Sequence, residues 1–274
     1  MRSTAHIYFF RDPEIKGIEI CRVEKSHHAF PNHAHDDIYA LSLIIGGASY
    51  CLGGKDSDRI VKAGEIVLLN PGQVHSGVPI GDNPISYWML NADIETMINL
   101  ASNVFEEKGC VPEFKKMILK NKKIAALFHQ VLLAFALSQD SLKKESLLND
   151  FLGVLFTHTC ETLPLPRAVG NENDAVYQAR QYLSQDLDQG LSLDTVARKV
   201  GFSQYHFLRL FKKHTGISPH QFRIQCRIQA AKNLIRQGLP FSAIALETGF
   251  SDQSHFTNKF RLYTGITPSQ YVHY

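Results

Sequence analysis

The chain has 274 residues, 44% of them hydrophobic and 20% charged, with a formal net charge of +3 at pH 7. This is the composition of an ordinary soluble protein with one or two domains. Its five cysteines are widely spaced and form no CxxC pair, which excludes a disulfide framework or a zinc finger. The chain starts without a signal-peptide core and has no apolar run near the ~18 residues of a membrane span, so we expect a cytoplasmic protein.

The first third of the chain, from about Ile7 to Leu90, has the composition of β-structure. Short runs of β-branched and aromatic residues are separated by Gly, Pro, Asn and Asp. Strands are predicted at residues 6–10, 17–24, 38–45, 49–53, 58–63, 65–70 and 85–90. Many short strands at even spacing favour a sandwich or a small barrel.

Two histidine-bearing segments lie within this β-region. They read FPNHAHDDIYALSLIIGG, residues 30–47, and AGEIVLLNPGQVHSG, residues 63–77. These segments resemble the two motifs of a cupin barrel. By that resemblance His33, His35 and His75 stand where cupin enzymes place metal ligands, and imidazole is the commonest ligand for zinc, iron or copper.

The acidic ligand that those enzymes take from the first motif would fall at Tyr39 or Ala40, so this chain lacks it. Three imidazoles can still hold a metal, and a His-x-His pair can also stabilise a barrel mouth through hydrogen bonds. We favour a third role, contact with an organic ligand, since small barrels hold one small ligand in their mouths. We therefore predict neither a metal nor another cofactor. The candidates for the ligand pocket are His33, His35, Tyr39, His75 and Trp88, of which Trp88 is better explained by core packing.

After Asn91 the apolar residues recur at helical spacing, which predicts helices around residues 124–135 and 142–162. Both are too apolar to be solvated on all sides. Either both pack on the barrel, or one of them pairs with its copy in a homodimer. Residues 164–173 then interrupt the pattern with Pro, Gly and polar residues, as a linker does. The predicted domains are residues 1–163 and 174–274.

The second predicted domain contains an internal repeat, Ser192–Phe222 and Pro240–Tyr271. One group of residues recurs 48 positions later: Ala197, Gly201, Phe202 and Ser203. A second group recurs 49 positions later: Phe207, Phe211, Thr215, Gly216, Ile217 and Pro219. One residue is therefore inserted in the second copy, between the GFS triplet and the first repeated Phe.

Each copy predicts two helices joined by a short turn that contains glycine, which is a helix-turn-helix motif. The motifs fall at about residues 193–214 and 241–263, after a helix at 175–185. A long helix capped by Ser218, begun by Pro219 and ended by Gly238 connects them. The second helix of such a motif lies in the major groove of DNA, where Arg reads guanine and Asn or Gln reads adenine.

The tandem resembles the DNA-binding domain of the AraC/XylS family of bacterial regulators. The residues that carry the resemblance are GFS at 201–203 and GFSDQSHFTNKFRLYTGITPSQY at 249–271. The resemblance implies seven helices, and base reading by Tyr205 and Arg209 in the first copy and by Gln253, Ser254 and Asn258 in the second. Asn258 stands where Arg is common in the family, which predicts weaker reading by the second motif. The complete set of predicted DNA contacts is Gln204, Tyr205, Arg209, Lys212, Lys213, Gln253, Ser254, Thr257, Asn258 and Arg261.

The charge is distributed unevenly along the chain. Residues 173–274 contain 12 Lys and Arg against 6 Asp and Glu, whereas residues 1–172 contain 17 against 20. A basic C-terminal part is typical of a phosphate-binding module. We expect Lys212, Lys213, Arg223 and Arg227 to neutralise DNA phosphates.

The sequence thus predicts an α+β protein in which a cupin-like domain, of the kind fused ahead of AraC-type domains, senses a small molecule and a helical domain binds promoter DNA. The resemblance implies a transcription regulator, in most relatives an activator, with RNA polymerase as a further partner, a homodimer as its assembly, and no membrane association. The alternatives are a cupin metallo-enzyme with an added helical domain, and a protein-interaction module. The missing carboxylate argues against the enzyme, and the polar outward helix faces argue against the interaction module.

Overall fold

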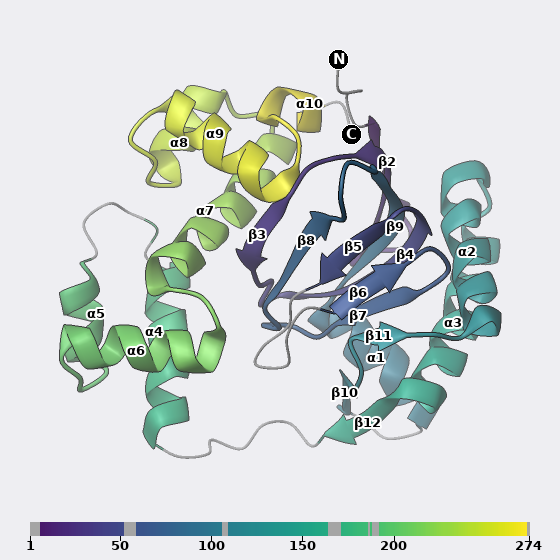
Figure 1. Ribbon diagram of the computed structural model, residues 1–274, viewed down its shortest axis with the longest axis horizontal. Helices are drawn as coiled ribbons and strands as arrows, with labels where there is room; N and C mark the ends of the chain where they lie inside the picture. Colours follow the sequence, from purple (N-terminus) through teal and green to yellow (C-terminus); the bar gives the residue numbers. More distant parts are fainter. Residues whose placement is uncertain are drawn as a thin grey trace. The chain divides into compact units, whose positions relative to one another are not determined.

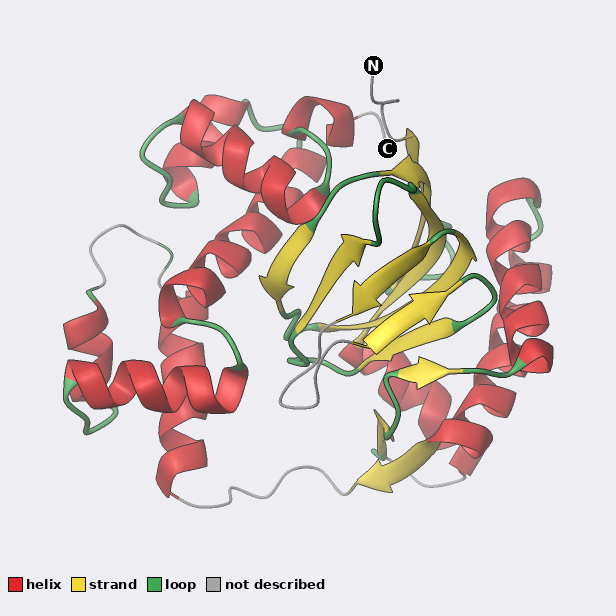
Figure 2. Ribbon diagram, viewed as in Figure 1, coloured by secondary structure: helices red, strands yellow, loops and turns green. Residues whose placement is uncertain are grey.

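A computed structural model describes residues 6–51, 59–105, 109–163, 171–185, 187 and 192–272 (Figure 1). The chain divides into two compact units. The first is built from Met1–Ala29, His35–Gln73 and Gly77–Arg167, and the second from Phe30–Ala34, Val74–Ser76 and Ala168–Tyr274. The first is rich in strands and the second is helical, so the fold is α+β as the sequence predicts (Figure 2). The predicted linker falls mostly on residues 164–170, which lie outside the described residues.

The strand-rich part of the chain forms two main sheets. The six-stranded sheet has the order β1 (His6–Phe10), β2 (Ile18–Ser26), β9 (Ile85–Asp93), β4 (Ile38–Gly46), β7 (Ile66–Leu69) and β11 (Ile118–Leu119). The four-stranded sheet has the order β3 (Phe30–His33), β8 (His75–Pro79), β5 (Ala48–Cys51) and β6 (Arg59–Lys62). A small ribbon pairs β10 (Val111–Phe114) with β12 (Cys160–Leu163).

Each predicted strand has a counterpart in these sheets. Residues 52–58, which include the end of the strand predicted at 49–53, lie outside the described part of the chain. The sequence did not predict β3 and β8. Their segments, FPNH and HSGVP, contain Pro or Gly and lack the alternation of apolar and polar residues that marks a strand. These two unpredicted neighbours in the four-stranded sheet carry His33 and His75.

The six-stranded sheet is covered on both faces. On β4, Tyr39, Leu41 and Leu43 belong to the core shared with the helices, whereas Ala40 and Ile44 belong to the core that includes Val61 of β6. Successive side chains of a strand point to opposite faces, so strands covered on both sides become apolar throughout. This explains why β7 is buried along its whole length.

Three helices pack against one face of this sheet: α1 (Ile94–Phe105), α2 (Lys122–Leu137) and α3 (Ser141–Thr159). The rings of Phe128 on α2 and Phe151 on α3 stack with centroids 4.5 Å apart and planes 4° from parallel. Both helices thus bury their apolar faces within the unit, in agreement with the first of the two packings considered. Homodimer formation stays a prediction. No helix in the described residues is both long and apolar enough to cross a bilayer.

Within the described residues the second unit has the seven helices that the family resemblance implies. They are α4 (Asn171–Gln185), α5 (Leu193–Lys199), α6 (Gln204–Thr215), α7 (Pro219–Arg236), α8 (Phe241–Glu247), α9 (Gln253–Thr264) and α10 (Pro268–Val272). The long helix α7 contacts α4 and α6 on one side of the tandem and α8, α9 and α10 on the other. It is capped by Ser218 and has Pro219 in its first turn, as predicted, and Gln221 completes a capping box with Ser218.

The two halves of this unit have equivalent aromatic cores. In the first half, the rings of Phe207 and Phe222 each lie 5.6 Å from that of Phe211, edge to face. In the second half, Phe256 and Tyr271 lie 5.6 and 5.5 Å from Phe260, again edge to face. The repeat in the sequence is therefore a repeat in packing, in which both second helices are anchored by the same pair of phenylalanines.

Candidate nucleic-acid interface and histidine cluster

The first helix-turn-helix motif consists of α5 and α6. The turn between them passes through Gly201, whose φ of +81° is a conformation that costs glycine little. The side chain of Ser203 then accepts a hydrogen bond from the backbone N–H of His206 at 3.3 Å and caps α6. Helix α6 ends at Gly216, again with positive φ. The two helices and their glycine-containing turn lie where the sequence predicts them.

The second motif, α8 and α9, shows what the inserted residue does. The turn passes through Gly249, with φ of +75°, and the triplet ends at Ser251, the counterpart of Ser203. The cap of α9 is the next residue, Asp252, whose carboxylate accepts from the N–H of His255 at 2.7 Å. The insertion thus moves the cap by one residue and replaces a hydroxyl by a charged acceptor.

Both second helices present polar side chains to solvent. The exposed members of the predicted contact set are Gln204, Arg209, Lys212 and Lys213 on α6, and Gln253, Ser254, Asn258 and Arg261 on α9. Thr257 is half-buried, and the side chain of Tyr205 lies outside the described part of the structure. Each predicted set is therefore carried by a single helix, opposite that helix's buried phenylalanines.

Arg227 corrects one sequence prediction. We expected this residue to neutralise a phosphate, but it is 8% exposed and lies inside the helical unit. Its Nε–H donates to the backbone carbonyl of Leu187 at 3.1 Å, and its guanidinium carbon lies 5.8 Å from the centre of the Phe250 ring. The signal that could have revealed this is its position in the apolar stripe of α7, beside Ile224, Ile228 and Ala231 in helical spacing.

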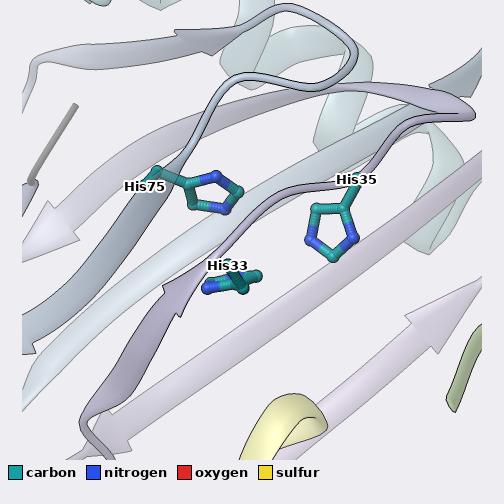
Figure 3. Close-up of side chains that lie close together, drawn as sticks. All are labelled: His33, His35 and His75. Carbon is teal, nitrogen blue, oxygen red and sulfur yellow. The ribbon is translucent and has the colours of Figure 1, made fainter. Parts of the chain in front are cut away.

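The structure brings His33, His35 and His75 together. His33 ends β3, His75 begins β8, and His35 follows β3 by two residues. Each ring offers a nitrogen, and the three nitrogens all lie within 4.8 Å of one another. Figure 3 shows the three rings converging from these two neighbouring segments. The cluster was predicted from the sequence as part of a ligand pocket, although the strands that carry it were not.

The ring of His33 is fixed by its backbone surroundings. Its Nδ1 lies 2.7 Å from the carbonyl oxygen of Pro31, which can only accept, so Nδ1 carries the proton. Burial lowers the pKa of His33 to about 4, although the Pro31 carbonyl works against this shift. The imidazole is therefore neutral near pH 7.

The structure does not bring Tyr39 and Trp88 to the histidines. Both belong to the core between the six-stranded sheet and the helices. The hydroxyl of Tyr39 donates to the carbonyl of Pro112 at 2.8 Å, and burial raises the pKa of this phenol. The guanidinium of Arg22 lies 5.1 Å from the ring centre of Trp88. We therefore omit both from the candidate site, and core packing of Trp88 agrees with the sequence argument.

Comparison with known proteins identifies the family. Residues 16–152 match the AraC-like ligand binding domain, and residues 196–273 match a helix-turn-helix domain. An HTH-type transcriptional regulator of Bacillus subtilis, YbfI, is 31% identical over 244 residues, which cover 89% of this chain and 87% of the relative. The chain belongs to the AraC family of transcription regulators. This family membership rules out the cupin metallo-enzyme alternative.

Two further proteins are similar over most of the chain. The lactose operon transcription activator of Staphylococcus xylosus is 24% identical over 218 residues, which cover 77% of this chain and 76% of that protein. ToxT from Vibrio cholerae has a similar structure, with a TM-score of 0.60 and 16% identity, covering 98% of this chain and 97% of ToxT. At that identity the likeness to ToxT concerns the fold alone. The chain is thus a DNA-binding regulator with an N-terminal ligand-binding domain.

Proposed function

We propose that this AraC-family regulator binds its promoter sequence-specifically through both helix-turn-helix motifs and activates transcription in response to a small molecule. The observation that carries the proposal is the pair of equivalent second helices, α6 and α9, each with a polar exposed face opposite buried phenylalanines. A helix of this kind can enter the major groove without losing its own packing.

On α6 we assign base reading to Arg209, with Tyr205 and Gln204 beside it. Arginine is suited to this role because its guanidinium binds two acceptors of guanine at once. Lys212 and Lys213 are exposed in the last turn of the same helix and are assigned to phosphates.

On α9 we assign base reading to Gln253, Ser254 and Asn258, with Thr257 beside them and Arg261 at a phosphate. Amide side chains favour adenine. An amide makes no charge-assisted contact, so we propose that this motif contributes less affinity than the first.

Activation is supported by the relatives. The lactose operon activator of Staphylococcus xylosus is named for this role, as is the virulence regulon activator VirF of Yersinia enterocolitica, which is 36% identical over 105 residues, 38% of this chain. We infer that RNA polymerase is the partner of the DNA-bound protein, that a homodimer is its assembly, and that it acts in the cytoplasm, where promoter DNA is found.

We place the effector at the cluster of His33, His35 and His75. An effector regulates only if it binds two states of the protein with different affinity, and the coupling free energy in such systems is roughly 1–3 kcal/mol. Effector binding is therefore expected to change DNA affinity by roughly 5- to 150-fold.

The experiment that tests the proposal maps the DNA fragments bound by the protein across a genome and then titrates the best site at several salt concentrations. A recurrent two-part motif with half-elements about one helical turn apart is the expected result. Changing Lys212 and Lys213 to Ala should reduce the salt dependence by about one counterion each while leaving the preferred sequence unchanged. Sequence-independent binding that disappears with salt would contradict the proposal, because only a basic surface would then be at work.

A further inference from the structure

We propose that His220, Arg223 and Lys259 form a third DNA contact, a binding site for one backbone phosphate between the two segments that α6 and α9 read. His220 and Lys259 have no role in the contacts assigned above. The inference rests on the proposed function for DNA as the ligand, and its test includes a duplex without the target sequence so that the two can fail separately.

The helices α6, α7 and α9 contain no Asp or Glu. Their sequences, QYHFLRLFKKHT, PHQFRIQCRIQAAKNLIR and QSHFTNKFRLYT, contain three, four and two Lys or Arg. By contrast, the sequences of α4, α5 and α8 each contain at least one Asp or Glu. No ion pair can therefore form among α6, α7 and α9, and their summed positive charge attracts an anion.

The basic residues at the start of α7 lie along one face. His220, Arg223 and Arg227 are three and four residues apart, so their side chains project from the same side of the helix. Burial increases along this face, because His220 is exposed, Arg223 is half-buried and Arg227 is 8% exposed. The bond from Arg227 to the carbonyl of Leu187 holds the inner end of the face, and the outer end is open to a ligand.

The second motif supplies the other side of the site. Helix α7 contacts both α6 and α9. The ring centre of Phe250 lies 5.8 Å from the guanidinium carbon of Arg227 on α7 and 5.4 Å from the ring centre of His255 on α9. Lys259 follows His255 by one turn of α9 and, like it, is half-buried. A phosphate bound between these helices belongs to the backbone that separates the two major-groove segments.

The groups that act on His220 are basic. Burial lowers the pKa of His220, and the charges of Lys259, Arg227 and Arg223 lower it further, with a last contribution from His255. Its imidazole is therefore mainly neutral near pH 7 in the protein without DNA. A phosphate offsets these positive charges and favours the imidazolium form, so DNA binding takes up a proton.

Other charged groups lie on the helices that pack against α7. Helix α6 ends with Lys212, Lys213 and His214, and the guanidinium carbon of Arg180 on α4 lies 5.6 Å from the centre of the Phe222 ring. These groups add positive charge to the same unit.

Two carboxylates lie near the ends of α8 and α9. Glu247 is the last residue of α8, and Asp252, which accepts a hydrogen bond from Ser251 at 3.0 Å, caps α9. Neither contributes to the pKa shift of His220.

The test titrates the full chain with a target duplex and a scrambled duplex, at pH 7.5 and pH 5.5 and at several salt concentrations. The pKa of His220 is higher in the complex than in the protein alone, so its contribution to affinity is present at low pH and is lost as the pH rises through the value in the complex. One proton changes affinity by at most tenfold per pH unit, and we expect a gain of roughly 3- to 10-fold at pH 5.5 on both duplexes.

Substitutions of His220 separate a phosphate contact from a structural role. His220→Gln cannot take up the proton and should lose the gain at pH 5.5. His220→Lys carries a permanent charge and should bind at pH 7.5 about as tightly as the wild type does at pH 5.5, an increase that a folding defect cannot produce. His158→Gln, which removes an exposed histidine of α3, is the matched control and should keep the full gain.

Substitutions of the two permanent cations complete the test. Arg223→Gln and Lys259→Gln should each weaken both duplexes equally and reduce the salt dependence by about one counterion. Arg198→Gln removes an exposed cation of α5 that is paired with Asp194, and it should leave the salt dependence unchanged.

The proposal is overturned if His220→Gln gains as much affinity at pH 5.5 as the wild type, or if His220→Lys binds no more tightly than the wild type at pH 7.5. If the target is preferred at both pH values while these variants respond in that way, the proposed function stands and the phosphate site alone is rejected. If neither duplex is preferred but the response to pH depends on His220, the phosphate site stands and sequence-specific reading is rejected.

Discussion

The two helix-turn-helix motifs of this protein share the chemistry of their turns. In each copy a threonine ends the second helix, with its hydroxyl 2.7 Å from a carbonyl oxygen one turn earlier, Thr215 to Phe211 and Thr264 to Phe260. A glycine with positive φ follows in both copies. These bonds join residues only four positions apart, so equal sequences produce equal turns.

The motifs differ in what surrounds the other turn of each motif, the one between its two helices. A methyl group added at Gly201 would meet no atom within 4 Å, whereas one at Gly249 would lie 2.1 Å from the carbonyl oxygen of Leu187 and 2.8 Å from Nη2 of Arg227. Phe250 is correspondingly buried at 1% exposure, and Phe202 is only half-buried. The comparison teaches that two copies of one sequence motif can differ in packing, because the turn at Gly201 is open whereas the turn at Gly249 packs against Leu187 and Arg227.

The second helices of the two motifs also differ in charge. Helix α6 ends with two lysines, whereas Arg261 is the basic residue in the last turn of α9. The outward position held by Arg209 on α6 is occupied by Asn258 on α9. We therefore expect the first motif to contribute more of the DNA-binding free energy. We expect the second motif to be packed more tightly within its unit.

The largest effect is expected from the two turn glycines. An L-residue with positive φ costs roughly 1–2 kcal/mol, so Gly201→Ala should lower the free energy of unfolding by that amount. Gly249→Ala also displaces the Leu187 carbonyl or Arg227, and a hydrogen bond to a charged group contributes roughly 1.5–3 kcal/mol, so we expect a loss of roughly 3–5 kcal/mol. Denaturant unfolding of both variants, followed by circular dichroism of the helical unit, provides the measurement. If both variants lost the same free energy of unfolding, the packing around Gly249 would contribute nothing to the cost of the substitution.

The next effect concerns base reading. Arg209→Ala should cost roughly 1–3 kcal/mol of binding free energy on the target site and relax discrimination at one base, because a bidentate contact is lost. Asn258→Ala should cost less, and Asn258→Arg should strengthen binding. Anisotropy titrations on target and scrambled duplexes measure all three variants. If Arg209→Ala weakened both duplexes equally, Arg209 would be a phosphate contact.

The smallest effect distinguishes the two helix caps by their pH dependence. The N–H of His255 and the hydroxyl of Ser251 lower the pKa of Asp252. A lowered folded-state pKa stabilises the protein above the usual carboxyl pKa of about 4, and that contribution is lost as the pH falls through the folded value. Between about pH 5 and pH 3 the wild type should therefore lose more stability than Asp252→Asn, which keeps the cap without the charge.

The control for this prediction is the first motif. Its cap, Ser203, does not titrate, so Ser203→Ala should cost roughly 0.5–2 kcal/mol at every pH. The measurement is the free energy of unfolding as a function of pH for the wild type and both variants. Parallel curves for the wild type and Asp252→Asn would mean that the carboxylate charge contributes nothing to the cap.

Much of the fold could be predicted because its signals are local. Ser218, Pro219 and Gln221 specify the start of α7 within four residues, and the two phenylalanines of α6 and of α9 specify which face of each helix is buried. The histidine cluster was also predictable, but only through the resemblance to a known barrel. Its strands β3 and β8 have no local pattern, since they are held by pairing with distant segments.

The sequence by itself determined the two domain types, the helix-turn-helix tandem, the outward faces of its second helices and the identity of the three histidines. Each of these depends on periodicity, on capping or on residue type, which are properties of short segments. Only the tertiary structure decided that Arg227 is buried against Leu187, that Tyr39 packs in the core, and that three imidazole nitrogens lie within 4.8 Å of one another. The physical reason is that burial and convergence depend on contacts between residues far apart in the chain, such as Arg227 with Leu187 and β3 with β8.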